Sequence, residues 1–269
     1  MAAVWPLRKI NRRITRLLNA AGLPRIRNVK PVLVLRHGDN IPVGLLGEAF
    51  DAGEVRWTEV MLHQGEPIPD LDDFSALVVL GGVMGAYDEQ THPWLADEKQ
   101  TIVEAHAADM PMFGICLGSQ LFADALGGKA YLIEATPEIA HMKPVLNEAG
   151  VEDPVLHHFD APVVTFHRDT WEPPPGATLL ATSDRFNQAF RFGSALAIQP
   201  HPEADAAIVA QWVEIEEELP LMKAAGVEPN DLVSEVIDGE AAQREMAARM
   251  FGAWVEEIKN HISCPPVGN

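Results

Sequence analysis

Short apolar runs alternate with longer amphipathic stretches from residue 31 onward. Four of the runs have the length and composition of strands that are buried on both faces: Val32–Leu35, Val55–Leu62, Ala76–Leu80 and Met110–Ile115. Apolar residues at helical spacing separate them, over Val43–Ala52 and from about Trp94 to Ala108. Because parallel sheets need crossovers of this kind, and crossovers are right-handed, the pattern predicts a doubly wound α/β fold with helices on both faces.

The second half of the chain has shorter strands with tight turns between them. They cover Val163–His167, Ala177–Thr182, Gln188–Phe192 and Ala195–Gln199, and we expect them to extend the sheet as antiparallel strands. Helical segments follow, from about Ala204 to Leu219 and from Gly239 to Ile262. No repeat or shift in composition marks a second domain. The predicted organisation is an extension at residues 1–30, one domain at 31–262 and a tail at 263–269.

Residues 7–21 predict a short basic amphipathic helix. Apolar side chains gather on one helical face, whereas most of the arginines lie elsewhere around it. Such a helix can pack on the acidic body, dock on a partner subunit or lie on an anionic membrane surface. An arginine-rich start without acidic residues also resembles an organelle transit peptide.

Charge and cysteine content restrict the class of protein. The chain has a formal charge of −19, although residues 1–30 carry eight basic and no acidic side chains, which leaves −27 on the rest. An acidic body repels phosphates, so nucleic acid is not expected as a partner. Only two cysteines are present, Cys116 and Cys264, which argues against a disulfide framework and predicts a cytoplasmic protein. No apolar run approaches the roughly 20 residues of a membrane span.

The segment Gly114-Ile115-Cys116-Leu117-Gly118 ends a predicted strand and precedes a helix. This is the arrangement of a nucleophile elbow, with cysteine in the position of serine. The sharp turn strains the backbone, and the glycines avoid clashes two residues away. The helix N-terminus favours a thiolate and offers N–H groups to a developing oxyanion. The alternative is a tight turn with a buried structural cysteine, so the assignment requires a base.

His201 and Glu203 supply the base and its partner. His201 follows the last predicted strand, and active sites of open α/β sheets gather at the carboxyl ends of strands. Glu203 can accept a hydrogen bond from the imidazole and hold it in the useful tautomer. Pro200 and Pro202 stiffen the segment. A histidine near a glutamate is common on protein surfaces, but together with Cys116 the pair predicts a catalytic triad.

Gly81 and Gly82 end the predicted strand at Ala76–Leu80. Backbone N–H groups at such a position can point into a cleft and receive an oxyanion. For this feature alone, a plain flexible loop is the alternative.

In this order, the three elements resemble the class I (triad) glutamine amidotransferases. The similarity is closest to the stand-alone branch that looks like the amidotransferase domain of GMP synthase, and it extends over about residues 31–260. Further matching motifs are Tyr87-Asp88, Gly127-Gly128, Phe166-His167-Arg168-Asp169 and Asn187-Gln188-Ala189-Phe190.

The resemblance implies a flavodoxin-like fold and a role for each matching residue. Cys116 would be the nucleophile, His201 the general base and then acid, and Glu203 the residue that orients it. Backbone N–H groups near Gly82 and of Leu117 would form the oxyanion hole.

The resemblance also implies a substrate site. Gln120 and the loop at Gly81 and Gly82 would help to hold glutamine. His167 would lie near the cleft, where a structural histidine at a strand end is an equal alternative.

The implied reaction is hydrolysis of the side-chain amide of L-glutamine through a cysteinyl thioester, with no metal or organic cofactor. Because the sequence has no candidate synthase motif such as a P-loop, we expect a separate synthetase or transferase subunit to accept the ammonia. Residues 7–21 are a candidate docking element for it. Two alternatives remain: a free-standing γ-glutamyl hydrolase acting on γ-glutamyl amines or peptides, and a non-catalytic regulatory subunit.

Overall fold

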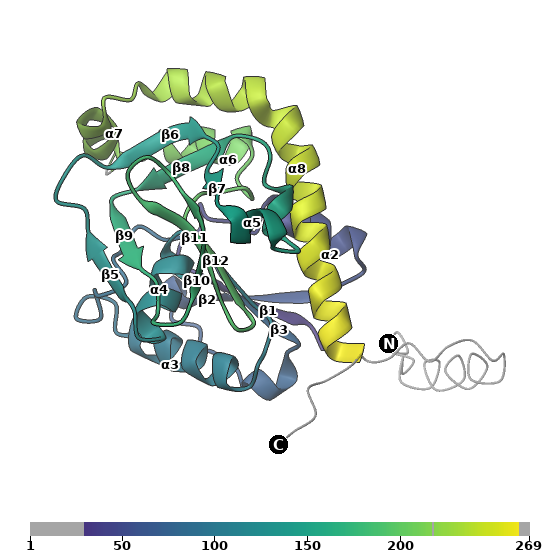
Figure 1. Ribbon diagram of the computed structural model, residues 1–269. Helices are drawn as coiled ribbons and strands as arrows, with labels where there is room; N and C mark the ends of the chain where they lie inside the picture. The colour runs from purple at the N-terminus through teal and green to yellow at the C-terminus, as the bar shows by residue number, and fades with distance from the viewer. Residues whose placement is uncertain (1–29, 217, 264–269) are drawn as a thin grey trace, which may run out of the picture.

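A mixed sheet organises the described residues, 30–216 and 218–263, of the computed structural model (Figure 1). Its strands follow the order β2 (Trp57–Met61), β1 (Val32–Arg36), β3 (Ala76–Val79), β4 (Met112–Ile115), β12 (Ala195–Ile198), β11 (Asn187–Phe192), β10 (Thr178–Thr182) and β7 (Val145–Leu146). The strands β2, β1, β3, β4 and β12 are parallel, and β11, β10 and β7 are added antiparallel. The predicted helix at residues 7–21, and Cys264, lie outside the described residues.

Two smaller sheets and several helices complete the fold. The pairs β5 (Lys129–Leu132) with β9 (Asp169–Glu172) and β6 (Glu138–Met142) with β8 (Val163–His167) form separate two-stranded sheets. The helices are α2 (Leu45–Ala52), α3 (Trp94–Ala107), α4 (Leu117–Ala125), α5 (Glu148–Glu152), α6 (Ala206–Trp212), α7 (Leu219–Ala225) and α8 (Pro229–Ser263), with 3-10 turns at Leu62–Gln64, Leu71–Asp73 and Leu156–His158.

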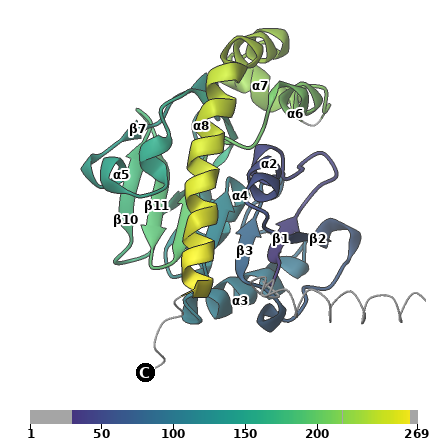
Figure 2. The ribbon, with the colours of Figure 1, turned by 90° about the vertical axis from the view of Figure 1, so that its right-hand side faces the viewer.

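The alternation of side chains along each central strand divides the core into two layers. Val32 and Val34 of β1 belong to an apolar cluster with α2 and α8, whereas Leu33 and Leu35 belong to a cluster with α3 and α4. Figures 1 and 2 show α8 running along one face of the sheet beside α2. Since both faces are covered, the strands contain almost only apolar residues. The doubly wound α/β fold predicted from the sequence is confirmed.

Two predicted strands differ in their pairing. Val163–His167 does not extend the main sheet, because β8 pairs with β6 instead. The strand predicted at Ala195–Gln199 is antiparallel only to β11, and its other edge is parallel to β4. The pattern of apolar residues shows that a strand is buried, but not which strand lies beside it.

The helical tail is also divided differently from the prediction. The helix expected over Ala204–Leu219 is α6 alone, and α7 begins only at Leu219, with Pro220 in its first turn. The last helix, α8, begins at Pro229 and passes through Gly239, where we expected it to start. A Cβ at Gly239 would lie 2.5 Å from the His141 ring, so this glycine allows a close approach rather than a helix end.

None of the helices within the described residues is both long enough and apolar enough to cross a lipid bilayer.

Gly118→Ala tests the close packing of α4 on β3. A Cβ at this position would lie 2.1 Å from the carbonyl oxygen of Val79. We expect the substitution to lower the free energy of unfolding by about 1–3 kcal/mol, as overpacking does, measured by urea denaturation. Gly252→Ala in α8 is the control, since no atom lies within 4 Å of its Cβ position. It should raise stability by up to about 1 kcal/mol. Unchanged stability of Gly118→Ala would contradict this packing.

Candidate active site

The parallel pairing of β4 with β12 brings Cys116 and His201 together. Ile115 at the end of β4 is in register with Ile198 at the end of β12. The N–H of Cys116 donates to the carbonyl of Ile198 at 2.8 Å, and His201 follows three residues later. Two segments that are 85 positions apart in the sequence therefore meet at the carboxyl edge of the sheet, where open α/β proteins bind their ligands.

Cys116 occupies the sharp turn between β4 and α4. Its φ of 52° and ψ of −106° place a residue with a side chain in the left-handed region, which typically costs about 1–3 kcal/mol. A Cβ on Gly114 would lie 2.8 Å from the backbone of Gly118. The turn can close only because both flanking residues are glycine.

The imidazole of His201 is held by the carboxylate of Glu203. His201 Nδ1 lies 2.7 Å from Glu203 Oε1, and both side chains are buried. The backbone N–H of His201 donates to Val164 O, which fixes the segment to β8. The ring also packs edge-on against Trp212, with 4.7 Å between ring centroids. With Nδ1 bonded to Glu203, the other ring nitrogen is left for proton exchange in the pocket.

Burial would lower the pKa of His201, but the charges of Glu203 and of the Cys116 thiolate outweigh it and raise this pKa above its ordinary value. The imidazolium form is therefore favoured next to the cysteine sulfur. An imidazolium beside a thiolate is the reactive state of a cysteine nucleophile.

Gly81 and Gly82 pass directly over the cysteine and the histidine. A Cβ on Gly81 would lie 3.1 Å from His201 Cε1 and 3.7 Å from Cys116 Cβ. A Cβ on Gly82 would lie 2.5 Å from a methyl carbon of Leu117. The structure thus brings the glycine loop and the first residue of α4 to the same side of the pocket as Cys116.

Gln120 and His167 meet at the backbone carbonyl of Asp169. Gln120 Nε2 donates to this oxygen at 3.3 Å, and His167 Nδ1 donates to it at 2.8 Å. His167 Nε2 lies 3.1 Å from Glu138 Oε2. Both residues line the pocket, but both nitrogens of His167 already have oxygen partners. This placement favours a structural contribution of His167 to the pocket wall.

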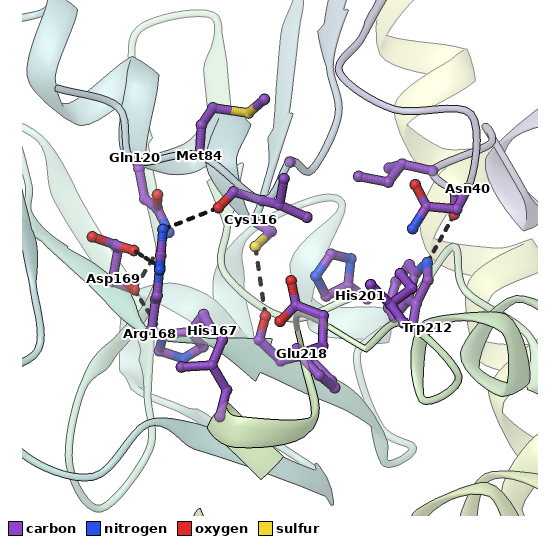
Figure 3. A pocket seen from close by; sticks show the side chains of 16 residues that line it. Asn40, Met84, Cys116, Gln120, His167, Arg168, Asp169, His201, Trp212 and Glu218 are labelled. Carbon is purple, nitrogen blue, oxygen red and sulfur yellow. Dashed lines mark hydrogen bonds and ion pairs between the residues drawn. The ribbon is translucent and has the colours of Figure 1, made fainter. Parts of the chain in front are cut away.

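The pocket in front of Cys116 has a volume of about 630 Å³ (Figure 3). Sequence reasoning missed several of its residues: Asn40, Arg168, Trp212 and Glu218. Arg168 lies inside a motif that the sequence analysis singled out, so its position could have been used. No sequence signal marks Asn40, Trp212 or Glu218, since each comes from a different loop or helix.

Arg168 and Tyr87 are connected through the side chain of Asp169. Arg168 Nε lies 3.4 Å from Asp169 Oδ2, and its Nη2 donates to Val83 O at 3.2 Å. Tyr87 donates its hydroxyl hydrogen to the other oxygen of the same carboxylate. Burial and Asp169 raise the pKa of Tyr87, so the phenol remains a donor. These contacts hold the guanidinium at the pocket wall.

Within residues 30–216 and 218–263, no group of three or more His, Cys, Asp or Glu side chains is placed to hold a metal ion.

Comparison with known proteins identifies the family. The model of the family "Glutamine amidotransferase class-I" matches residues 52–208, more than half of the chain. A glutamine amidotransferase from Thermotoga maritima has a similar structure, with a TM-score of 0.76 and 28% identity over 84% of this chain and 98% of that one. The chain belongs to the class I glutamine amidotransferases.

Three sequence relatives are more distant or shorter matches. The glutamine amidotransferase-like protein YfeJ of Salmonella typhimurium is 34% identical over 48% of this chain, and the match spans only 56% of YfeJ. The glutamine-hydrolysing GMP synthase of Sulfurisphaera tokodaii has one subunit that is 28% identical over 54% of this chain and 75% of that protein. γ-Glutamyl peptidase 4 of Arabidopsis thaliana is 28% identical over 65% and 71%. The resemblance inferred from the sequence motifs is confirmed at the level of the family.

Glu203→Gln tests the electrostatic origin of the His201 pKa. Removing the negative charge leaves burial, which disfavours the imidazolium, opposed by the cysteine alone. We expect the pKa of His201 to fall relative to the wild type, measured by NMR titration of the imidazole resonances. Glu138→Gln is a control because Glu138 pairs with His167 and not with His201. An unchanged His201 pKa in Glu203→Gln would show that the carboxylate does not stabilise the imidazolium.

Proposed function

We propose that this protein hydrolyses the side-chain amide of glutamine, with Cys116, His201 and Glu203 as its catalytic triad in the unit formed by residues 31–262. The observation that carries the proposal is the buried imidazole of His201, bonded to Glu203 and electrostatically coupled to Cys116 on a strained elbow. Family membership gives this arrangement its chemistry, since the family is defined by glutamine-dependent amide transfer.

The first half of the reaction forms a glutamyl thioester. Cys116 Sγ attacks the γ-carboxamide carbon, and the carbonyl oxygen becomes an oxyanion that accepts hydrogen bonds from the N–H groups of Gly82 and Leu117. The C–N bond then breaks, and His201 gives its proton to the departing ammonia. In the second half His201 takes a proton from water, which attacks the thioester and releases glutamate and the free thiolate.

Two charged residues of the pocket suit the other end of the substrate. Arg168 can bind the α-carboxylate of glutamine, and Glu218 can bind its α-ammonium group. Figure 3 shows both side chains at the pocket that opens in front of Cys116. A site that binds both groups accepts an amino acid whose α-carbon is unsubstituted and reacts at its γ-carbonyl.

The ammonia requires an acceptor enzyme. The similarity to one component of a glutamine-hydrolysing GMP synthase supports a partner that is a separate synthetase or transferase. Docking of that partner through residues 7–21 would leave the described body free to carry the glutamine site.

A γ-glutamyl hydrolase is the second candidate. The similarity to γ-glutamyl peptidase 4 favours it, and the same triad would attack a γ-glutamyl amide or peptide. The two candidates differ in the leaving group, so relative kcat/KM values for glutamine and for γ-glutamyl dipeptides distinguish them.

Cys116→Ala tests the proposed chemistry. We expect purified wild-type protein to release glutamate from glutamine, and the variant to lose this activity by more than about a thousandfold, because no other group forms the thioester. An enzyme-coupled glutamate assay measures the release. The protein should be assayed alone and with candidate synthetases, since a partner can control the amidotransferase. Glutamate release that survives in Cys116→Ala would refute the assignment of the nucleophile.

Arg168→Met tests the proposed contact with the α-carboxylate. Loss of a charge-assisted hydrogen bond should raise KM for glutamine by roughly tenfold to a hundredfold, with a smaller change in kcat, in steady-state assays. Arg249→Met is the matched control, because Arg249 pairs with exposed Asp160 and does not line the pocket. Equal KM values for the two variants would exclude Arg168 as a substrate contact.

A further inference from the structure

His37 is a buried histidine beneath the glycine loop that the proposed reaction mechanism does not use. It follows β1, and its side chain has no exposed surface. Its Nδ1 lies 2.8 Å from the carbonyl oxygen of Gly81, and its Nε2 lies 3.0 Å from Glu98 Oε1 of α3. The ring stacks on Trp94, with 5.4 Å between centroids. Three elements therefore fix the imidazole, and one of its bonds reaches the loop above the cysteine.

The bond from His37 fixes the orientation of the peptide group between Gly81 and Gly82. The described residues contain no cis peptide bond, and in a trans peptide the C=O and the N–H point in opposite directions. Since the Gly81 carbonyl points at His37, the Gly82 N–H points away from it. Gly82 lines the pocket that contains Cys116, so this N–H lies on the side where an oxyanion would form.

A peptide between two glycines needs such an anchor. Neither residue has a Cβ to restrict its dihedral angles, and glycine has the largest conformational freedom of any residue. The loop must nevertheless lack side chains, because a Cβ on Gly81 or Gly82 would crowd His201 or Leu117. The space near Cys116 thus requires glycines, and a hydrogen bond to the backbone supplies the rigidity that side chains cannot.

Glu98 makes His37 suitable for this task. Burial would lower the pKa of His37, but the charge of Glu98 and its hydrogen bond outweigh burial and raise the pKa. The protonated ring donates from both nitrogens at once, which matches the two oxygen acceptors that it faces. The pair lies beside apolar residues of the α3 layer, where an ionised carboxylate is costly without a partner.

We propose that His37, held by Glu98, is a positioning residue that aims the N–H of Gly82 at the developing oxyanion. The inference rests on the proposed function, because it assigns the direction of one oxyanion donor of that reaction. It predicts that the hydrogen bond to Gly81, rather than the buried charge, determines the rate of acyl transfer.

The test compares two substitutions of His37 in a Glu98→Gln background, which avoids leaving a buried carboxylate unpaired. His37→Asn places an amide N–H where Nδ1 lies, whereas His37→Phe keeps an aromatic ring on Trp94 but has no donor. His106→Gln, on the same helix as Glu98 and stacked on Phe192 outside the pocket, is the control. The readouts are kcat and KM for glutamine, and the rate of Cys116 alkylation by iodoacetamide.

We expect the Glu98→Gln and Glu98→Gln/His37→Asn proteins to keep kcat within a few-fold of the wild type. The Glu98→Gln/His37→Phe protein should lose about tenfold to a hundredfold in kcat, somewhat less than removal of a whole oxyanion donor costs. Its KM and its alkylation rate should not change, because alkylation forms no oxyanion. A merely destabilised fold would alter all three. Equal kcat values for the Asn and Phe proteins would overturn the proposal.

Crystal structures separate this inference from the proposed function. If the wild type releases no glutamate from glutamine with or without partners, the proposed function fails, but the orientation of the peptide can still be compared. In the Phe protein the Gly81 carbonyl should turn away from position 37, whereas in the Asn protein it should keep its direction. A carbonyl that keeps its direction in both proteins would overturn the positioning role.

Discussion

The arrangement of the site depends on one interaction, the parallel pairing of β4 with β12. It places the elbow of Cys116 and the segment of His201 at neighbouring strand ends, and the bond from Cys116 N–H to Ile198 O joins them directly. The loop after β3 and His37 after β1 reach the same edge because these strands are parallel as well. A slip of β12 by one residue would turn its side chains to the opposite face and carry His201 away from the sulfur.

Contacts beneath the surface hold this edge rigid. Gln243 of α8 is fully buried and donates to the carbonyls of Pro202 and Ala204, on either side of Glu203. The N–H of Leu45, at the start of α2, donates to the carbonyl of Glu203 itself at 2.9 Å. The orienting carboxylate is therefore fixed through its backbone by both helices of one layer. Such support is what allows the strained backbone at Cys116 to persist.

Local sequence signals predicted the parts of the fold and site that depend on near neighbours. Glycines around Cys116, and the short spacing from His201 to Glu203, are visible in the sequence because the geometry is set within a few residues. His37, Glu98, Gln243 and Glu218 were missed because their contacts join segments far apart in the sequence. The pairing of β8 and the start of α8 were wrong for the same reason: a buried apolar run does not reveal its neighbour, and Gly239 marks a close approach to His141.

The wide separation of these contacts along the chain also sets when the site can form during synthesis. Domains form from the N-terminus as the ribosome extends the chain. The elbow at Cys116 can fold early, but the strand that pairs with it and the imidazole that faces it are made some 80 residues later. Gln243, which braces the backbone around Glu203, follows later still. A nascent chain therefore carries an unactivated thiol until nearly all of the body has emerged, and the complete constellation appears only together with the finished fold.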